Sequence, residues 1–232
     1  MLEKPRSLTI LDWTTGVLLL AAAGLVFFYA PVEAVMGPVQ KVFYFHVAAA
    51  WVGMLGFFAA AAAGGIYLRT GRMRWDRVEY AAVEISLVFF LAAIVTGSIW
   101  ARPAWNTWWT WDPRLTTAAV VELIYFAYLL LRQGVEDPAR RARFAAVYAV
   151  FGFISVPLTF LSIRLLRTIH PVVIGSGQEA FRMIPSMQAA FFFSLFAFSV
   201  FFANLLWHRI RLADLRASLE KIRRQRWERR SG

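Results

Sequence analysis

Six long apolar stretches constrain the fold of this 232-residue chain more than any other feature. They cover residues 13–30, 42–68, 80–100, 116–131, 144–161 and 187–207. A helix needs about 20 apolar residues to cross roughly 30 Å of hydrocarbon. Only 17% of the residues are charged, whereas soluble domains carry about a quarter. The sequence therefore predicts an all-α, polytopic membrane protein with six transmembrane helices.

The basic residues indicate how these helices are oriented. Nineteen of the 25 lysines and arginines lie on one side, in the N-terminal segment, the second and fourth loops and the chain after residue 207. Cytoplasmic loops carry the excess of Lys and Arg, so both termini are expected in the cytoplasm. This topology accounts for the net charge of +11, and no nucleic acid is expected as a partner. We divide the chain into a six-helix membrane domain, residues 1–207, and a basic cytoplasmic tail, residues 208–232, which suits a helix lying along anionic lipid.

Tryptophans gather in the third loop, residues 101–115, which faces outward in this topology. Four of them lie within seven residues, and an aspartate and an arginine follow: Trp105, Trp108, Trp109, Trp111, Asp112 and Arg114. An aromatic belt at the membrane interface is the simple alternative, but a belt places one or two tryptophans at each of many helix ends. Four indoles in one short loop indicate a platform for a large, flat, apolar ligand with an anionic edge.

Two of the three histidines belong to the same outer side. His46 lies near the outer start of the second span, and His170 lies in the fifth loop. The third, His208, lies at the cytoplasmic end of the last span. A histidine at a helix end is commonly just a hydrogen-bonded interfacial residue. Two on one face, beside the tryptophan loop and in a chain without cysteine, favour axial ligation of heme iron.

Charged residues on the outer side and within the spans are further candidates. Four arginines lie on the outer side: Arg102, Arg114, Arg164 and Arg167. They suit the two propionates of a heme, because guanidinium pairs with carboxylate in bidentate fashion. For each of them a lipid headgroup is the alternative partner. Carboxylates inside spans are functional candidates by default. We expect Glu122 to support the tryptophan loop or to hydrogen-bond across helices, and Glu84 to pair with Arg77.

These residues resemble the signature of the heme-handling proteins of cytochrome c maturation (system I), and within them the short, six-span CcmC family. That family carries W-G-x-W-W-x-W-D-x-R-L-T in an outward loop, and this chain matches it from Trp105 to Thr116 except that Asn106 replaces the glycine. The segments around both histidines are also similar to the family's two histidine segments. In the first, Ala48 stands where proline is usual.

The resemblance implies a heme-handling function in the bacterial inner membrane, with the functional loops on the periplasmic side. It implies heme b as the ligand, His46 and His170 as its axial ligands and the four tryptophans as its platform. Asp112 and Arg114 would shape the platform and the contact with a chaperone. The heme would pass to the heme chaperone CcmE, and the small subunit CcmD and the ABC transporter subunits CcmA and CcmB would belong to the same assembly. The chain itself is not expected to hydrolyse nucleotides, because it has no G-x-x-x-x-G-K-[ST] loop.

Three other functions remain open from the residues. A membrane heme redox subunit would bury histidine pairs within the helices. A transporter of heme or another small molecule would show discontinuous helices and polar groups near the midplane, for which Pro157 in the fifth span is slight support. A scaffold for the transporter subunits would leave the tryptophan cluster without a role.

Overall fold

The computed structural model describes residues 3–171 and 183–231. The regular secondary-structure elements within these residues are all helices. The elements are α1 (Arg6–Gly24), the π-helical turn η1 (Leu25–Tyr29), α2 (Gln40–Thr70), α3 (Met73–Trp105), α4 (Pro113–Gln133), α5 (Pro138–Gly152), α6 (Ser155–Leu165) and α7 (Pro185–Ser231). Six segments are long and apolar enough to cross a membrane: Arg6–Tyr29, Gln40–Thr70, Met73–Trp105, Pro113–Gln133, Pro138–Leu165 and Pro185–Arg229. The predicted six-span, all-α fold is confirmed.

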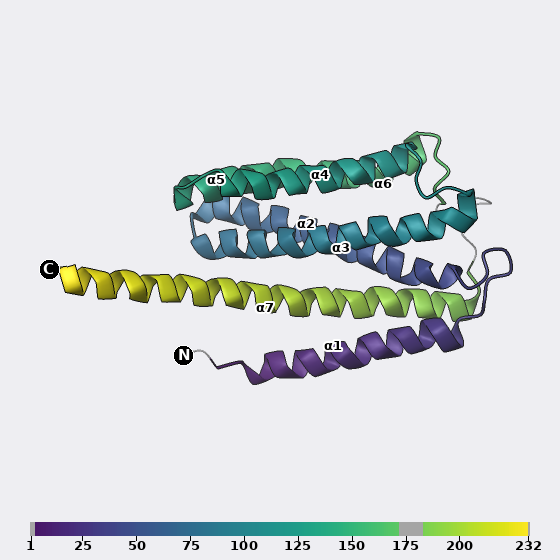
Figure 1. Ribbon diagram of the computed structural model, residues 1–232, viewed down its shortest axis with the longest axis horizontal. Coiled ribbons are helices and arrows are strands. Elements are labelled where there is room, and N and C mark those ends of the chain that lie inside the picture. Colours follow the sequence, from purple (N-terminus) through teal and green to yellow (C-terminus); the bar gives the residue numbers. More distant parts are fainter. Residues whose placement is uncertain (1–2, 172–182, 232) are drawn as a thin grey trace.

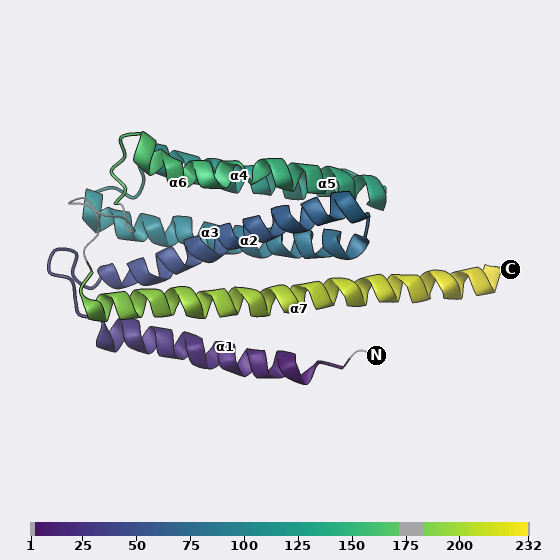
Figure 2. The same ribbon diagram turned by 180° about the vertical axis from the view of Figure 1, so that it is seen from behind.

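The helices run side by side along one axis (Figure 1). Both termini lie at one end of the bundle, together with the α2–α3 and α4–α5 connections, and the view from behind shows the same arrangement (Figure 2). The connections α1–α2 and α3–α4 and the chain leaving α6 lie at the opposite end. This arrangement brings the start of α2, the tryptophan loop and the segment of His170 to the same end of the molecule.

Capping residues explain where α4 and α5 begin. Asp112 precedes Pro113, and its carboxylate accepts a hydrogen bond from the Leu115 amide at 3.0 Å. Asp137 precedes Pro138 and accepts one from the Arg140 amide at 2.7 Å. An aspartate at the N-cap followed by proline in the first turn is a strong start signal, because the side chain satisfies a free amide and proline needs none.

The fifth span consists of two helices, α5 and α6, with a turn at residues 153–154 between them. Pro157 has no backbone N–H with which to bond the Phe153 carbonyl, so the helical ladder cannot run through this point. The Phe153 carbonyl instead accepts a hydrogen bond from the Val156 amide at 3.0 Å. The break is therefore a local consequence of proline.

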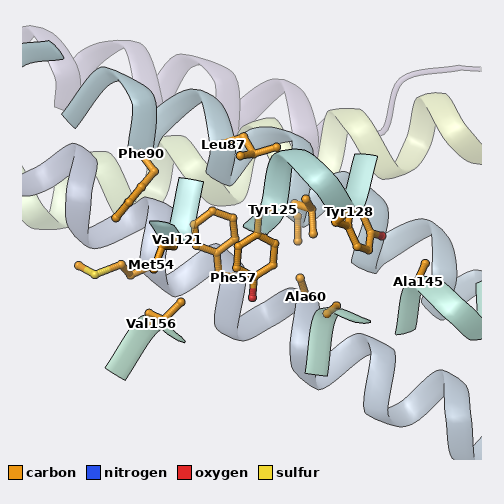
Figure 3. Close-up of a cluster of buried hydrophobic side chains, with 13 residues drawn as sticks. Met54, Phe57, Ala60, Leu87, Phe90, Val121, Tyr125, Tyr128, Ala145 and Val156 are labelled. Carbon is orange, nitrogen blue, oxygen red and sulfur yellow. The ribbon is translucent and has the colours of Figure 1, made fainter. Parts of the chain in front are cut away.

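The main hydrophobic core lies between α2, α3, α4, α5 and the start of α6 (Figure 3). At its centre the rings of Phe57 and Tyr125 stack with centroids 3.7 Å apart and planes at 11°. Ala60 and Ala145 are fully buried beside them and let the helices approach closely. Small residues at helix–helix contacts are the usual device for packing in a membrane, where dispersion contacts take the place of the hydrophobic effect.

Ion pairs join α7 to α3, and a histidine–aspartate contact joins α7 to α1, at the end of the bundle that holds the termini. Arg209 contacts the Glu84 carboxylate at 2.5 Å, and Arg77 contacts Asp214 at 2.5 Å. The expected pairing of Glu84 with Arg77 is therefore wrong, because α7 continues past its membrane segment and brings its own charges to both residues. His208 contacts Asp12 of α1 at 2.7 Å. The predicted boundary at residue 208 coincides with no break in α7, which continues to Ser231.

Candidate functional site

A cavity of about 300 Å³ opens at the end of the bundle opposite the termini. Its wall contains both candidate histidines, two of the four loop tryptophans and two of the candidate arginines: His46, His170, Trp105, Trp109, Arg114 and Arg164. Most of the remaining wall is apolar, from α2, α3, α4, α6 and α7. An apolar cavity with a few convergent polar groups is the usual form of a small-molecule site, and its volume falls at the lower end of the roughly 300–1,000 Å³ that such sites span.

The imidazole of His46 is held by the backbone of α3. Its Nδ1 lies 2.8 Å from the carbonyl oxygen of Ala93, and a carbonyl can only accept, so Nδ1 carries the hydrogen. This hydrogen bond fixes the neutral tautomer in which Nε2 keeps its lone pair, as the backbone carbonyls and carboxylates that hydrogen-bond to metal-binding histidines do. Gly97 makes room for the ring, because a Cβ at that position would lie 2.7 Å from Cε1 of His46.

His170, which lines the same cavity, shows the same arrangement. Its Nδ1 lies 3.0 Å from the carbonyl oxygen of Pro171, which leaves Nε2 as the free nitrogen. Its ring meets the indole of Trp105 with centroids 6.4 Å apart. Burial, together with the neighbouring charge of Arg114, lowers the pKa of His170 to about 4. The imidazole is therefore neutral, and able to bind a metal, at physiological pH.

This shift predicts an unusual acid limit for ligand binding at His170. An ordinary histidine has a pKa of 6.5 and would lose its free lone pair as the pH falls through that value. Because the pKa is depressed to about 4, the neutral form persists between pH 6.5 and about 4, and protonation would compete with a metal ligated by Nε2 only below that range. We expect heme binding, followed by visible absorption, to be constant from pH 7.5 to pH 5. A midpoint near pH 6.5 would contradict this.

Asp112 connects the tryptophan loop to the segment of His170. Its Oδ1 caps α4, and its Oδ2 accepts hydrogen bonds from the Thr168 hydroxyl and, at 3.2 Å, from the Ile169 amide. The Thr168 hydroxyl in turn accepts a hydrogen bond from the His170 amide at 3.1 Å. Asp112 therefore positions His170 without lining the cavity itself.

The four tryptophans divide into two pairs. Trp105 and Trp109 line the cavity, whereas Trp108 and Trp111 are 58% and 77% exposed and do not line it. Trp100, which lies before the loop, is part of the wall, and its indole N–H donates to the Gln40 side chain at 3.0 Å. The structure thus brings together half of the predicted platform and adds two indoles from outside the loop, Trp100 and Trp51.

The candidate arginines also divide. Arg114 donates to the Thr159 carbonyl at 2.6 Å and lies over the Phe160 ring, with its guanidinium against the cavity. Arg164 lines the cavity as well. Arg102 turns back to cap α3 by donating to the Asn106 carbonyl at 2.5 Å, and Arg167 is exposed outside the cavity wall.

The residue that replaces the family's glycine, Asn106, takes the backbone conformation for which glycine is used. Its φ is 54°, in the left-handed region, and it ends α3. Asparagine tolerates this region better than other non-glycine residues do. We expect Asn106→Gly to leave the thermal unfolding temperature nearly unchanged, and Asn106→Val to cost about 1–2 kcal/mol of unfolding free energy. Equal unfolding temperatures for the two variants would contradict the argument.

The chemistry of the cavity suits a metal that arrives with ligands of its own. Within residues 3–171 and 183–231 no group of three or more His, Cys, Asp or Glu side chains could hold a bare metal ion. Two imidazoles match the axial positions of an iron whose other four ligands are porphyrin nitrogens. The buried indole N–H of Trp109 has no hydrogen-bond partner among the described residues, so it is free to donate to an anionic edge of a ligand.

Comparison with known proteins agrees with this geometry. One protein-family model, described as heme exporter protein C, matches residues 3–226. The chain belongs to the heme exporter protein C family. The heme exporter protein C of Bradyrhizobium diazoefficiens is 33% identical over 195 residues, which cover 80% of this chain and 73% of that protein. The Escherichia coli K12 protein of the same name is 30% identical over 186 residues, covering 80% and 74%.

Membership of the heme exporter protein C family covers the whole described bundle, because the match begins before α1 and ends within α7. Sequence reasoning had singled out both histidines, Trp105, Trp109 and Arg114, which all meet at the cavity. It missed Gly97 and the Ala93 carbonyl, which together set the orientation of His46. An isolated glycine within a helical pattern was the available signal, since such a glycine usually marks a close approach.

Proposed function

We propose that this chain binds heme b between His46 and His170 and hands it to the chaperone CcmE during cytochrome c maturation. The observation that carries the proposal is the pair of imidazoles on one apolar cavity, each with Nδ1 hydrogen-bonded to a backbone carbonyl and Nε2 free. The names of its relatives, which are heme exporter proteins, support heme as the ligand. Heme supplies the iron and is cargo here.

Different residues around the cavity would hold the heme and release it. The two imidazoles would bind the iron from opposite sides, Trp105 and Trp109 would cover the apolar ring, and Arg114 would meet a propionate. His46 is fixed in a helix, whereas His170 is held in a loop through Asp112 and Thr168. We infer that release begins at His170, because the loop is the easier of the two supports to displace.

The exposed tryptophans complete the proposal. Trp108 and Trp111 do not line the cavity but lie beside it in the same loop, so they offer an apolar surface to a chaperone. This site would face the periplasm, with the bundle in the inner membrane and both termini in the cytoplasm. CcmD and the ABC transporter subunits CcmA and CcmB would complete the assembly.

The test is the visible spectrum of the purified full-length chain titrated with hemin. We expect a bis-histidine Soret band in the parent, and the loss or a shift of that band in His46→Ala and in His170→Ala. His208→Ala is the matched control, because it removes the remaining histidine, which pairs with Asp12 at the other end of the bundle. Unchanged heme binding in both cavity variants would overturn the site. Retained heme with failed transfer to CcmE in Trp111→Ala would support the chaperone surface.

Transport across the bundle is the second candidate, because the fifth span is interrupted between α5 and α6. Discontinuous helices line the substrate sites of many transporters. Replacing Pro157 with alanine would restore the missing amide and favour one continuous helix. If the chain transports heme, this variant should bind heme normally and lose movement of heme across proteoliposomes.

A further inference from the structure

The last helix, α7, continues past the end of the bundle without interruption, and its projecting part is called the rod below. In both views α7 runs beyond the α2–α3 and α4–α5 connections and ends far from the other helices (Figures 1 and 2). Where it leaves the bundle, Arg209 pairs with Glu84 and Asp214 pairs with Arg77, each at 2.5 Å. From Asp214 to Ser231 the rod is about 25 Å long at 1.5 Å per residue.

An apolar seam runs along this projecting helix. Leu205, Leu212 and Leu219 follow one another at intervals of seven residues, and Leu215 and Ile222 come three residues after the second and third of them. This is the spacing of the a and d positions of a coiled coil. Leu212, Leu219 and Ile222 are 42%, 48% and 47% exposed, so the seam has only a partial covering within the molecule.

The seam begins in a groove on the bundle. The groove has a volume of about 590 Å³. Its apolar lining is Leu205, Leu212 and Leu215 of α7 with Ile85 of α3, and the rest of its lining is basic: Lys4, His208, Arg209 and Arg211. The apolar side chains of α7 in this groove are members of the seam. A partner lying along α7 would therefore find apolar side chains at 212, 215, 219 and 222 that start against the body of the protein, whereas the preceding d position is His208.

Arginines follow one edge of the seam. Arg209, Arg216 and Arg223 occupy the e position of successive heptads, next to the d position of the seam. Arg209 is already paired with Glu84. Arg216 and Arg223 are exposed, and neither forms an ion pair with any described residue. Charges at e and g positions select the partner helix, and arginine at this edge selects carboxylates.

We propose that the projecting part of α7 docks an amphipathic helix of a partner protein, whose apolar seam is flanked by acidic residues. A second copy of the chain fits poorly, because parallel pairing would place Arg216 opposite the g-position Arg211 of the other copy, and like charges repel. A lipid surface also fits poorly, since a helix lying on a membrane has a broad apolar face and α7 continues the axis of the bundle. This inference does not depend on the heme site.

A synthetic helix tests the proposal with the full chain in a zwitterionic detergent. The probe has leucine at its a and d positions and glutamate at e and g, and its binding is followed by fluorescence anisotropy. We expect saturable binding that Arg216→Glu weakens about tenfold or more, because an attraction becomes a repulsion. Lys221→Glu makes the same change of charge at the c position, away from the seam, and is expected to have little effect.

Two further comparisons distinguish binding at the seam from nonspecific binding of the probe. Leu219→Ala should weaken binding of the same probe, whereas Ala217→Ser, on the opposite side of the helix, should not. A probe with lysine in place of glutamate should bind much more weakly to the parent. If the lysine probe binds equally well, or if Arg216→Glu and Lys221→Glu weaken binding equally, the proposal is wrong.

The other occupants have tests of their own. The chain has no cysteine, so Leu219→Cys introduces a single reporter on the seam. Rapid formation of a disulfide-linked dimer by this variant would assign the seam to a second copy and overturn the proposal. Binding of the full chain's tail to phosphatidylglycerol vesicles that blocks the acidic probe, and that Arg216→Glu and Lys221→Glu reduce equally, would assign it to lipid instead.

Discussion

The variant Gly97→Ala is expected to lose heme affinity by about 10–100-fold, the range found when the hydrogen-bond partner that orients a metal ligand is removed. A Cβ at this position would lie 2.7 Å from Cε1 and 3.1 Å from Nδ1 of His46. The imidazole must therefore move, and it then loses the 2.8 Å hydrogen bond to the Ala93 carbonyl that aims Nε2 into the cavity. The substitution adds one methyl group and removes no ligand.

The fold should tolerate this change, because alanine is a better helix former than glycine by about 1 kcal/mol. Gly65→Ala, in α2, is the matched control, since a Cβ there has nothing within 4 Å. Hemin titration and thermal unfolding in detergent should be measured on both variants. The expected result is weak heme binding by Gly97→Ala alone, with neither variant less stable than the parent. Normal affinity and an unchanged Soret band in Gly97→Ala would contradict the assigned orientation of His46.

The number of spans could be predicted because hydropathy alone determines which segments can cross a bilayer. The helix ends could not be predicted this way. Helix α3 begins at Met73, before the predicted span, and its first turns carry Asp76 and Glu79, both buried. In the sequence, a charged residue indicates the end of a span unless its partner is known. The partners here are Arg132 and Tyr128, which lie far along the chain in α4.

The candidate site shows the same limit. Residue type and loop position indicated His46 and His170 as candidates, and the resemblance to the family separated Arg114 from the other outer arginines; all three line the cavity. Residue type and loop position could not divide the tryptophans, since the direction of each indole depends on the left-handed turn at Asn106 after α3. They also could not supply the Ala93 carbonyl, because any residue type can present a backbone oxygen.

The buried ion pair at the other end of the bundle carries the second large prediction. Arg132 of α4 binds Asp76 of α3 with contacts of 2.6 and 3.1 Å, and their side chains are only 10% and 7% exposed. Tyr128 donates to Glu79 at 2.9 Å beside them. We expect Arg132→Ala to cost about 3–5 kcal/mol of unfolding free energy, because it leaves Asp76 as a buried charge without its partner.

The exposed pair of Arg77 and Asp214 provides the control for this prediction. Its side chains are 29% and 51% exposed, and a solvated pair contributes about 0–1 kcal/mol, so Arg77→Ala should lower the unfolding temperature far less than Arg132→Ala. Equal losses of unfolding temperature in the two variants would show that burial does not determine the stability lost when an ion pair is broken.

The double variant Arg132→Met with Asp76→Leu separates the cost of an orphaned charge from the worth of the pair. It removes both charges and keeps apolar volume between α3 and α4. Replacing a buried pair with apolar residues is often neutral or stabilising, so we expect the double variant to recover most of the stability that Arg132→Ala loses. If it unfolds as easily as Arg132→Ala, the ion pair itself holds α3 to α4. Recovery would instead show that Arg132→Ala loses stability because it leaves Asp76 as a buried, unpaired charge, and that the ion pair itself adds little stability.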